Sequence, residues 1–365
     1  MDLADKLNEF GRAALKQGDY GQAAVLFQRA IDKAPNDPAY WNNLGRAYFR
    51  RRDYPRAEEA YNQAVSLKLD YAIARQGRAH LRLLQGDWLG GWSDYRWRYR
   101  HADGARPDRV ADRINLKGQK VVLYRDLGLG DEIFFLRWLP ELQAIAASVK
   151  YAPDPRLFAL LKRSGIPVLT SEDDGAIFES VADLPFLLRS CKTPRPVTLK
   201  PSQPITDDAR KLLERIGPRP WVGYTHEAGT PGVETSLHKH VPRDMLVAAI
   251  KGPWTLVNVI RTAPGEPVPP SAFIANDPDL SLSLMSLLDE YVTVSNTNVH
   301  LRAGLGLPSR VLVPEPPEFR WGLGDRSLFF PDCPLYRQRG TAWLPALNML
   351  KEDLWQRLTL TSSRV

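Results

Sequence analysis

The sequence predicts α + α/β architecture, with helical hairpins over about residues 1–100 followed by a compact α/β body. Three observations lead to this fold class. A short pattern ending in Asp and an aromatic residue recurs at a fixed interval in the first hundred residues. From about residue 118, short apolar runs alternate with longer helical stretches. A glycine-containing turn joins the first apolar run to a helix, as in the opening unit of a Rossmann-like domain.

The recurring pattern begins at residues 18, 52 and 86, so that its repeat length is 34 residues. This length is typical of tetratricopeptide (TPR) hairpins. Small residues fall in the same register where two helices must approach closely. The second repeat is the most complete, and it resembles the TPR consensus at Trp41, Leu44, Gly45, Tyr48, Ala57, Tyr61 and Ala64. We therefore predict about three TPR hairpins over residues 1–100.

The third repeat is atypical because arginines replace apolar or small residues at Arg78, Arg82 and Arg98. Terminal repeats commonly differ because one face meets something other than another repeat. We therefore expect this repeat to dock on the domain that follows it. A TPR stack forms a groove for protein segments, and a purely structural brace is the alternative.

The composition limits the classes of protein to consider. The net charge is +7, but the arginine clusters accompany no nucleic-acid-binding motif, so we expect no nucleic-acid partner. The two cysteines, Cys191 and Cys333, are too few for a zinc site or a disulfide framework. The polar first residues lead us to expect no signal peptide, and there is no apolar run of about 18 residues. These features predict a cytoplasmic protein without a transmembrane segment, with the inner face of the membrane as an alternative location.

The remaining chain alternates strands and helices. We expect strands at 121–124, 149–152, 167–170, 221–224, 254–259, 291–294 and 309–313. We expect helices at about 155–164, 207–216, 243–251, 281–289, 298–305 and 343–357. A proline-rich stretch from Pro194 to Pro220 brackets one of these helices and predicts a hinge between two Rossmann-like halves.

The first turn of this body carries a candidate catalytic acid. Gly128 and Gly130 precede Asp131 and the helix that follows it, but the spacing is not that of a dinucleotide-binding loop. A carboxylate at this place suits proton acceptance from a hydroxyl acceptor. The residues alone leave a second interpretation equally open, in which Asp131 is an N-cap. Glu227 is an alternative base.

Three segments of the body resemble the heptosyltransferase-type glycosyltransferases (family 9), and more closely bacterial proteins that join TPR repeats to such a domain. The first is the turn and helix at 128–140. The second is 294–304, where Thr297 and His300 match the family's second signature. The third is 314–321 followed by 335–338. The segment 239–242 is a looser match.

The resemblance implies a GT-B fold of two Rossmann-like halves, which we place at 118–205 and 219–340, followed by a C-terminal helix at 341–365. It implies a nucleotide-diphosphate sugar as substrate, no cofactor and no metal. Asp131 becomes the expected catalytic base. The expected donor-binding residues are Gly128, Gly130, Lys239, Arg261, Ser295, Asn296, Thr297, Asn298, His300 and Glu315. Phe319 and Trp321 are candidates for stacking on a nucleobase, with packing of their own segment as the alternative.

The function that these features predict is sugar transfer to a hydroxyl on a protein or glycan acceptor, which the TPR region selects. Ser295 departs from the pattern, because the family has Asp at that place. This departure favours an alternative, in which the body is catalytically degenerate and the protein is a TPR scaffold that recruits partners.

Overall fold

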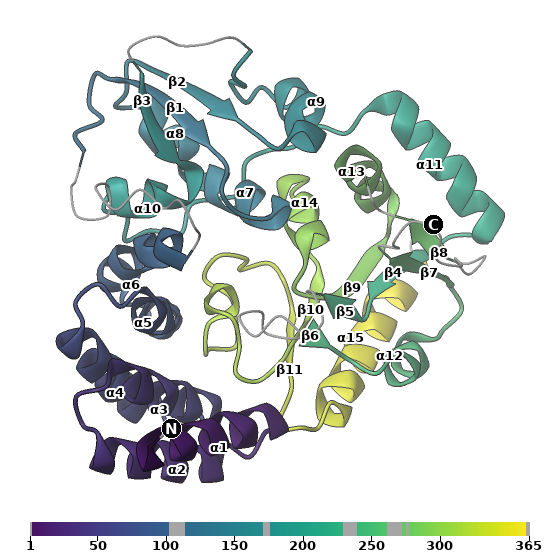
Figure 1. Cartoon of the computed structure of the whole chain (residues 1–365). Coiled ribbons are helices and arrows are strands. Elements are labelled where there is room, and N and C mark those ends of the chain that lie inside the picture. The colour runs from purple at the N-terminus through teal and green to yellow at the C-terminus, as the bar shows by residue number, and fades with distance from the viewer. Residues whose placement is uncertain are drawn as a thin grey trace. The chain divides into compact units, whose positions relative to one another are not determined.

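The computed structural model describes residues 2–101, 114–170, 176–228, 239–260, 272–274 and 277–362 (Figure 1). The chain forms two compact units. The repeat unit comprises Met1–Ile114, Pro185–Cys191 and Pro316–Leu323. The body comprises Asn115–Leu184, Lys192–Glu315 and Gly324–Val365. Within the described residues, no helix is long and apolar enough to cross a membrane.

The repeat unit contains three helical hairpins, followed by the 3-10 helix η1 (Arg96–His101). The hairpin helices are α1 (Leu3–Gln17), α2 (Tyr20–Lys33), α3 (Pro38–Arg50), α4 (Tyr54–Leu67), α5 (Ala72–Gln85) and α6 (Trp88–Tyr95). The recurring Asp has a local cause. Asp19, Asp53 and Asp87 are N-caps, and each side chain accepts a hydrogen bond from a backbone N–H of the first turn of the second helix.

Glycine is required where the two helices of a hairpin cross. A Cβ atom on Gly45 would lie 2.8 Å from the ring of Tyr61, and one on Gly11 would lie 2.6 Å from the ring of Phe27. Both rings are buried, so any larger residue at the glycine would have to displace one of them. The small-residue register of the sequence therefore reflects close approach of helix to ring.

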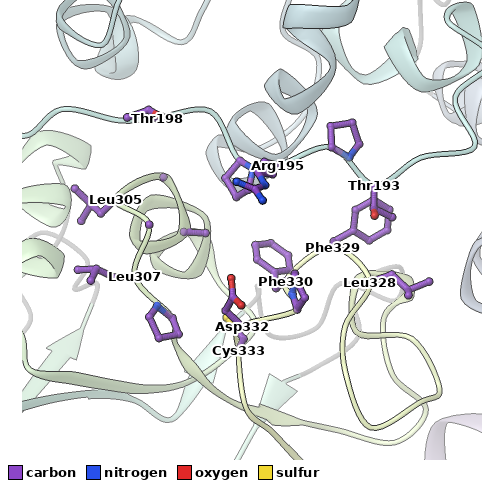
Figure 2. Close-up of a pocket in the computed structure, with 17 residues that line it drawn as sticks. Thr193, Arg195, Thr198, Leu305, Leu307, Leu328, Phe329, Phe330, Asp332 and Cys333 are labelled. Atoms are coloured by element: carbon purple, nitrogen blue, oxygen red, sulfur yellow. The ribbon is translucent and has the colours of Figure 1, made fainter.

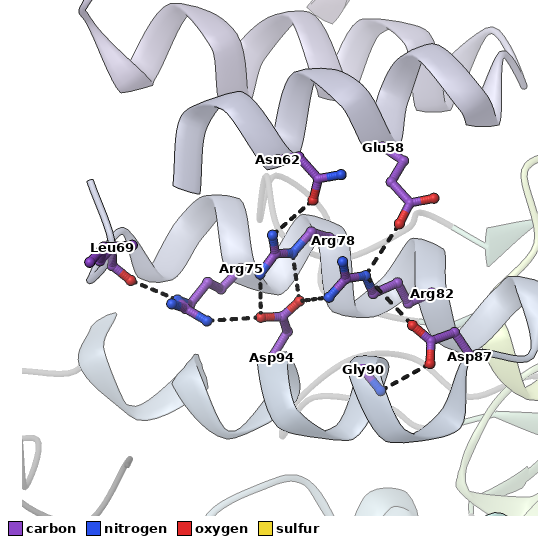
Figure 3. A network of polar contacts seen from close by, with 9 residues as sticks. All are labelled: Glu58, Asn62, Leu69, Arg75, Arg78, Arg82, Asp87, Gly90 and Asp94. Carbon is purple, nitrogen blue, oxygen red and sulfur yellow. Dashed lines mark hydrogen bonds and ion pairs between the residues drawn. The ribbon is translucent and has the colours of Figure 1, made fainter. Parts of the chain in front are cut away.

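Three arginines of α5, Arg75, Arg78 and Arg82, surround one carboxylate (Figure 3). Asp94 of α6 is 2% exposed, and it accepts hydrogen bonds from Arg75, Arg78 and Arg82 of α5 at 2.7–3.1 Å. Arg78 and Arg82 are therefore explained within the hairpin, and the expected docking of the repeat on the following domain stays a prediction. They replace the apolar contact between the helices of this hairpin with a buried ionic one.

Aromatic packing completes the third repeat instead. Phe319, in the 3-10 helix η5 (Phe319–Trp321), lies 5.6 Å from His80, 5.7 Å from Trp92 and 6.5 Å from Tyr95 between ring centroids. Arg96 lies 4.6 Å from the centroid of the Phe186 ring. The segments Pro185–Cys191 and Pro316–Leu323 therefore belong to the core of the repeat unit, although they come from much later in the chain.

The N-terminal half of the body has a small parallel sheet in the order β2-β1-β3. Its strands are β1 (Lys120–Tyr124), β2 (Ser148–Ala152) and β3 (Ile177–Ser180). Its helices are α7 (Leu129–Phe135), η3 (Leu136–Trp138), α8 (Leu139–Gln143), α9 (Pro155–Arg163) and η4 (Val181–Asp183). The short helix α10 (Leu184–Leu187) follows, and it belongs to the repeat unit from Pro185 on. The strand expected at 167–170 is reduced to one bridge, between Val168 and Tyr151.

The C-terminal half has a parallel six-stranded sheet in the order β11-β10-β9-β4-β7-β8. Its strands are β4 (Trp221–Thr225), β7 (Thr255–Ile260), β8 (Ala272–Ile274), β9 (Glu290–Val294), β10 (Arg310–Val313) and β11 (Leu335–Arg337). A separate hairpin pairs β5 (Glu227–Ala228) with β6 (Lys239–His240). The helices are α11 (Gln203–Ile216), α12 (Arg243–Ile250), α13 (Pro278–Leu287), α14 (Thr297–Gly304) and α15 (Leu344–Ser362).

The expected fold class, helical repeats followed by an α/β body with two parallel sheets, is confirmed. Buried aliphatic side chains explain why the larger sheet forms. Val222, Val292, Val294 and Leu312 pack against α12 and α15 on one face, and Trp221, Val257 and Tyr291 pack against α11 and α13 on the other. Sheets covered on both faces need such continuous apolar strands. The sequence did not predict β3, β8 or β11.

Candidate functional site

Two helix N-termini meet in the body, one from each half (Figure 1). A Cβ atom on Gly130, in the first turn of α7, would lie 3.2 Å from both Thr297 Oγ1 and His300 Cδ2 of α14. The absence of a side chain at Gly130 thus allows the two turns to touch. The fold brings together Gly130, Asp131, Thr297 and His300, which the sequence placed in one site from segments about 165 residues apart.

Side chains that precede and open α14 hold its first turn to the sheet. Asn296 is the N-cap, and its Oδ1 accepts from Val299 N at 3.3 Å. Its Nδ2 donates to Tyr291 Oη at 3.1 Å and to Thr293 Oγ1 at 2.9 Å. Asn298 Nδ2 donates to the same Tyr291 oxygen at 3.2 Å. Both asparagine amides therefore turn toward the protein, and their expected role as side-chain donors to a ligand stays a prediction.

The same turn also carries backbone donors that the cap does not use. Within the described residues, the N–H groups of Thr297 and Asn298 make no hydrogen bond to the protein, because the cap satisfies only Val299. Uncapped N–H groups at a helix N-terminus bind anions, and the helix dipole adds to the attraction. Ser295, just before the cap, is 3% exposed and lies between the strand and this turn.

His300 is 5% exposed and is packed among rings. Its ring centroid lies 5.8 Å from that of Phe134 and 5.4 Å from that of Phe330. Arg137 lies over both phenyl rings and donates to Phe329 O at 2.6 Å. The imidazole is thereby fixed at the contact between α7 and α14, with its Cδ2 edge toward Gly130.

The structure rules out one of the two interpretations of Asp131, that of an N-cap. The N-cap of α7 is Gly128, and Asp131 is the third residue of the helix, so the N-cap interpretation is wrong. The next residue behaves differently. Glu132 is fully buried and accepts from Tyr151 Oη at 2.6 Å and from Asp154 N at 3.1 Å. Burial raises the pKa of the Glu132 carboxyl. Asp131, which is only partly buried, therefore remains the better-placed acid for a reacting group.

Lys239 and Glu227 lie on the β5–β6 hairpin. This hairpin follows β4 directly and packs beside β9, so it lies at the carboxyl edge of the larger sheet, as α14 does. His226 precedes the hairpin, and burial lowers its pKa. Ligands of open parallel sheets bind at this edge. The edge placement suits the predicted role of Lys239, which stays a prediction.

Roles were also predicted for Arg261, for Glu315, and for Phe319 and Trp321. Arg261 lies outside the described residues. Glu315 follows β10, and its carboxylate accepts from Gly340 N at 2.7 Å, so it holds a turn as well as standing at the sheet edge. Phe319 and Trp321 are 3% and 1% exposed and belong to the repeat unit. Of the two roles considered for them, the structure shows packing of their own segment and not stacking on a nucleobase.

The sequence analysis did not predict one cluster of charged side chains. Asp154, after β2, binds Arg156 through both carboxylate oxygens and Arg125 Nη1 at 2.7 Å. These contacts lower the pKa of Asp154 to about 2, with the Arg156 hydrogen bonds as the largest cause. Arg125 follows β1, and Arg156 lies in the first turn of α9, which follows β2. The sequence could have shown this cluster, because parallel strands end at one edge of a sheet.

A pocket of about 650 Å³ lies beside this site (Figure 2). Its walls are the linker 193–198, the turn after α14 at 303–308, and the loop 328–333. Phe330 lines the pocket and also contacts His300, so one ring separates the two. The lining includes none of the residues predicted from the sequence to bind a donor.

The fold and the site define a protein in which helical repeats are joined to an α/β body with opposed helix N-termini. Residues 8–75 match the family model of the tetratricopeptide repeat, and the N-terminal segment is thus a TPR region. Of the solved structures, the first TPR of Spaghetti bound to an HSP90 peptide is 31% identical, covering 26% of this chain and 75% of that chain with a TM-score of 0.25. The glycosyl transferase family 9 protein from Veillonella parvula is 10% identical, covering 68% of this chain and 98% of that chain with a TM-score of 0.46.

Curated relatives extend the comparison. E3 ubiquitin-protein ligase CHIP from Arabidopsis thaliana is 34% identical over 65 residues, which is 18% of this chain. RNA polymerase II-associated protein 3 from Rattus norvegicus is 35% identical over 79 residues, or 21% of this chain. Protein FlbA from Caulobacter vibrioides is 23% identical over 253 residues, or 59% of this chain. The matches span 23%, 12% and 42% of these relatives' own lengths.

Proposed function

We propose that this protein is a glycosyltransferase of the GT-B type, which moves a sugar from a nucleotide-sugar donor to a hydroxyl of a protein or glycan acceptor. The observation that carries the proposal is the contact of α7 with α14. Asp131, a partly exposed residue in the first turn of α7, follows the glycine that touches the first turn of α14, where the N–H groups of Thr297 and Asn298 are uncapped. A catalytic base on one half of the body and an anion site on the other suit a single displacement step at the anomeric carbon of a sugar.

In this proposal, the acceptor oxygen attacks the anomeric carbon while its proton passes to Asp131. The bond from that carbon to the leaving phosphate breaks on the opposite face, which inverts the configuration. The departing charge is taken by the first turn of α14 together with Lys239, where preorganised donors act most strongly on developing charge. No cofactor takes part.

The first test is binding. We expect the full chain to bind one member of a panel of UDP-, GDP-, ADP-, CDP- and CMP-sugars in calorimetric titration. We then expect Asp131→Asn to keep donor affinity and to lose transfer by about 10²- to 10⁴-fold, the usual contribution of a general base. Asp208→Asn, on the exposed face of α11, is the matched control. Full transfer by Asp131→Asn would show that the base is another group.

A second function is favoured by Ser295, which stands where the resembling family has an acid. In this alternative the body does no chemistry and the TPR region recruits partners as a scaffold. The panel titration separates the two, because a scaffold predicts no binding of any nucleotide sugar. If the TPR region selects the acceptor, binding of the acceptor does not depend on the chemistry of the body. A variant without transfer activity should then still capture the acceptor.

A further inference from the structure

We propose that Tyr291 is a positioning residue for the anion-binding turn of α14, an inference that rests on the proposed function. Tyr291 lies on β9 and is fully buried, so it cannot touch a ligand itself. Its hydroxyl nevertheless joins three side chains: Thr225 at 2.8 Å, Asn296 at 3.1 Å and Asn298 at 3.2 Å. Both asparagines flank the N–H groups that would hold the leaving phosphate.

The direction of each hydrogen bond follows from counting protons. Thr225 donates its only hydroxyl proton to Val259 O at 2.7 Å. Tyr291 must therefore donate its own proton to Thr225 Oγ1. The Tyr291 oxygen is left with acceptor capacity only, which the amides of Asn296 and Asn298 fill. The chain of bonds runs from α14 through β9 and β4 to the backbone of β7.

This polarity fixes which atoms of the turn face a ligand. Asn296 has both amide protons engaged, on Tyr291 and Thr293, so its oxygen must cap Val299 N. A reversed amide would place two oxygens against each other at Tyr291. The cap then satisfies Val299 and leaves the N–H groups of Thr297 and Asn298 for the phosphate. Tyr291 thereby acts on the ligand through the asparagines.

The test compares two buried tyrosines in the full chain. Tyr291→Phe removes the hydroxyl and keeps the ring. Tyr336→Phe is the control, because its hydroxyl is also buried and bonded, to Arg310 and Asp353, but lies on β11. The probes are inorganic pyrophosphate and the diphosphates UDP, GDP, ADP and CDP with CMP, titrated by calorimetry.

We expect Tyr291→Phe to weaken the affinity for the bound probe by about fivefold or more, the size of one hydrogen bond, and Tyr336→Phe by less than twofold. In a double-mutant cycle, Asn298→Ala should add little to Tyr291→Phe, since both act on one turn. Unchanged affinity in a folded Tyr291→Phe protein, or fully additive effects, would overturn the proposal.

A second readout needs no ligand. Amide hydrogen exchange over residues 296–300 should quicken in Tyr291→Phe and stay unchanged in Tyr336→Phe. If the natural chain binds none of the probes, the proposed function fails while this measurement still decides the role of Tyr291. Equal exchange over residues 296–300 in the natural chain and Tyr291→Phe would then reject the positioning role.

Discussion

Gly130 and His300 lie so close together that a single added carbon atom at Gly130 would reach the imidazole ring. The added Cβ would lie 3.2 Å from His300 Cδ2 and 3.3 Å from Thr297 Cα, which is backbone. His300 cannot easily retreat, because Phe134 and Phe330 pack against it. The spacing between the two halves of the body at this point is therefore set by a residue without a side chain.

Gly130→Ala should shift α14 by a few tenths of an ångström and weaken pyrophosphate binding several-fold. The net change in unfolding free energy should be small, because about 1 kcal/mol of gained helix propensity offsets a crowding cost of about 1–3 kcal/mol. Gly21→Ala, in the first turn of α2, is the control, since the nearest atom to its Cβ, Asp19 Oδ1, is 3.6 Å away. Calorimetry and thermal melting measure both quantities, and equal affinity in the two variants would contradict the prediction.

Asp94→Asn should strongly destabilise the repeat unit, because three arginines would face one another without their shared carboxylate. Removing one partner of a buried ion pair costs about 3–5 kcal/mol. Chemical denaturation measures the change. Asp208→Asn, which breaks the exposed pair with Lys211, should change stability by less than about 1 kcal/mol. A similar small effect at Asp94 would mean that the arginines are solvated in solution.

The repeats were predictable because their signal is local. Each hairpin repeats the same cap and the same close contact, so that Asp19, Asp53 and Asp87 recur at one interval. The pairing of Arg75, Arg78 and Arg82 could not be predicted, for the opposite reason. Their counterion, Asp94, lies 12 to 19 residues away in the sequence. Nothing in the sequence distinguishes it from other polar helix residues, because the pairing forms only when the two helices of the hairpin pack together.

In the body, apolar runs predicted the buried strands but missed those whose side chains are partly exposed or polar, such as β3 and β11. The segment at 167–170 looked apolar enough for a strand, yet only Val168 pairs with β2. The motifs predicted which turns meet, through Gly130 and Thr297. They did not predict Tyr291, because a tyrosine in an apolar strand gives no sign of where its hydroxyl points.

Asp154 should make stability depend on pH in the acid range. Its folded pKa is about 2, below the ordinary value of 3.8, so the folded state favours the ionised form. The contribution is present above about pH 4 and is lost as pH falls toward 2. We expect it to be about 1–2 kcal/mol, because Arg125 and Arg156 are half exposed and solvent screens them.

The measurement for Asp154 is the unfolding free energy of the natural chain and of Asp154→Asn between pH 6 and pH 2. The variant should be less stable at pH 6, and the difference between the two proteins should shrink steadily below pH 4. A difference that stays constant across this range would show that the carboxylate is not held ionised by its arginines.

Phe319→Ala should destabilise the repeat unit and leave nucleotide binding unchanged. The ring is 3% exposed and packs edge-on against His80, Trp92 and Tyr95. Truncating a buried phenylalanine costs about 3–5 kcal/mol, because the cavity closes only in part. Leu323→Ala, 48% exposed at the end of the same segment, should cost much less. If Phe319→Ala instead kept its stability and lost affinity for nucleoside diphosphates, the ring would belong to a ligand site after all. Thermal melting and calorimetry on the same samples separate these outcomes, because packing acts on unfolding and stacking acts on binding.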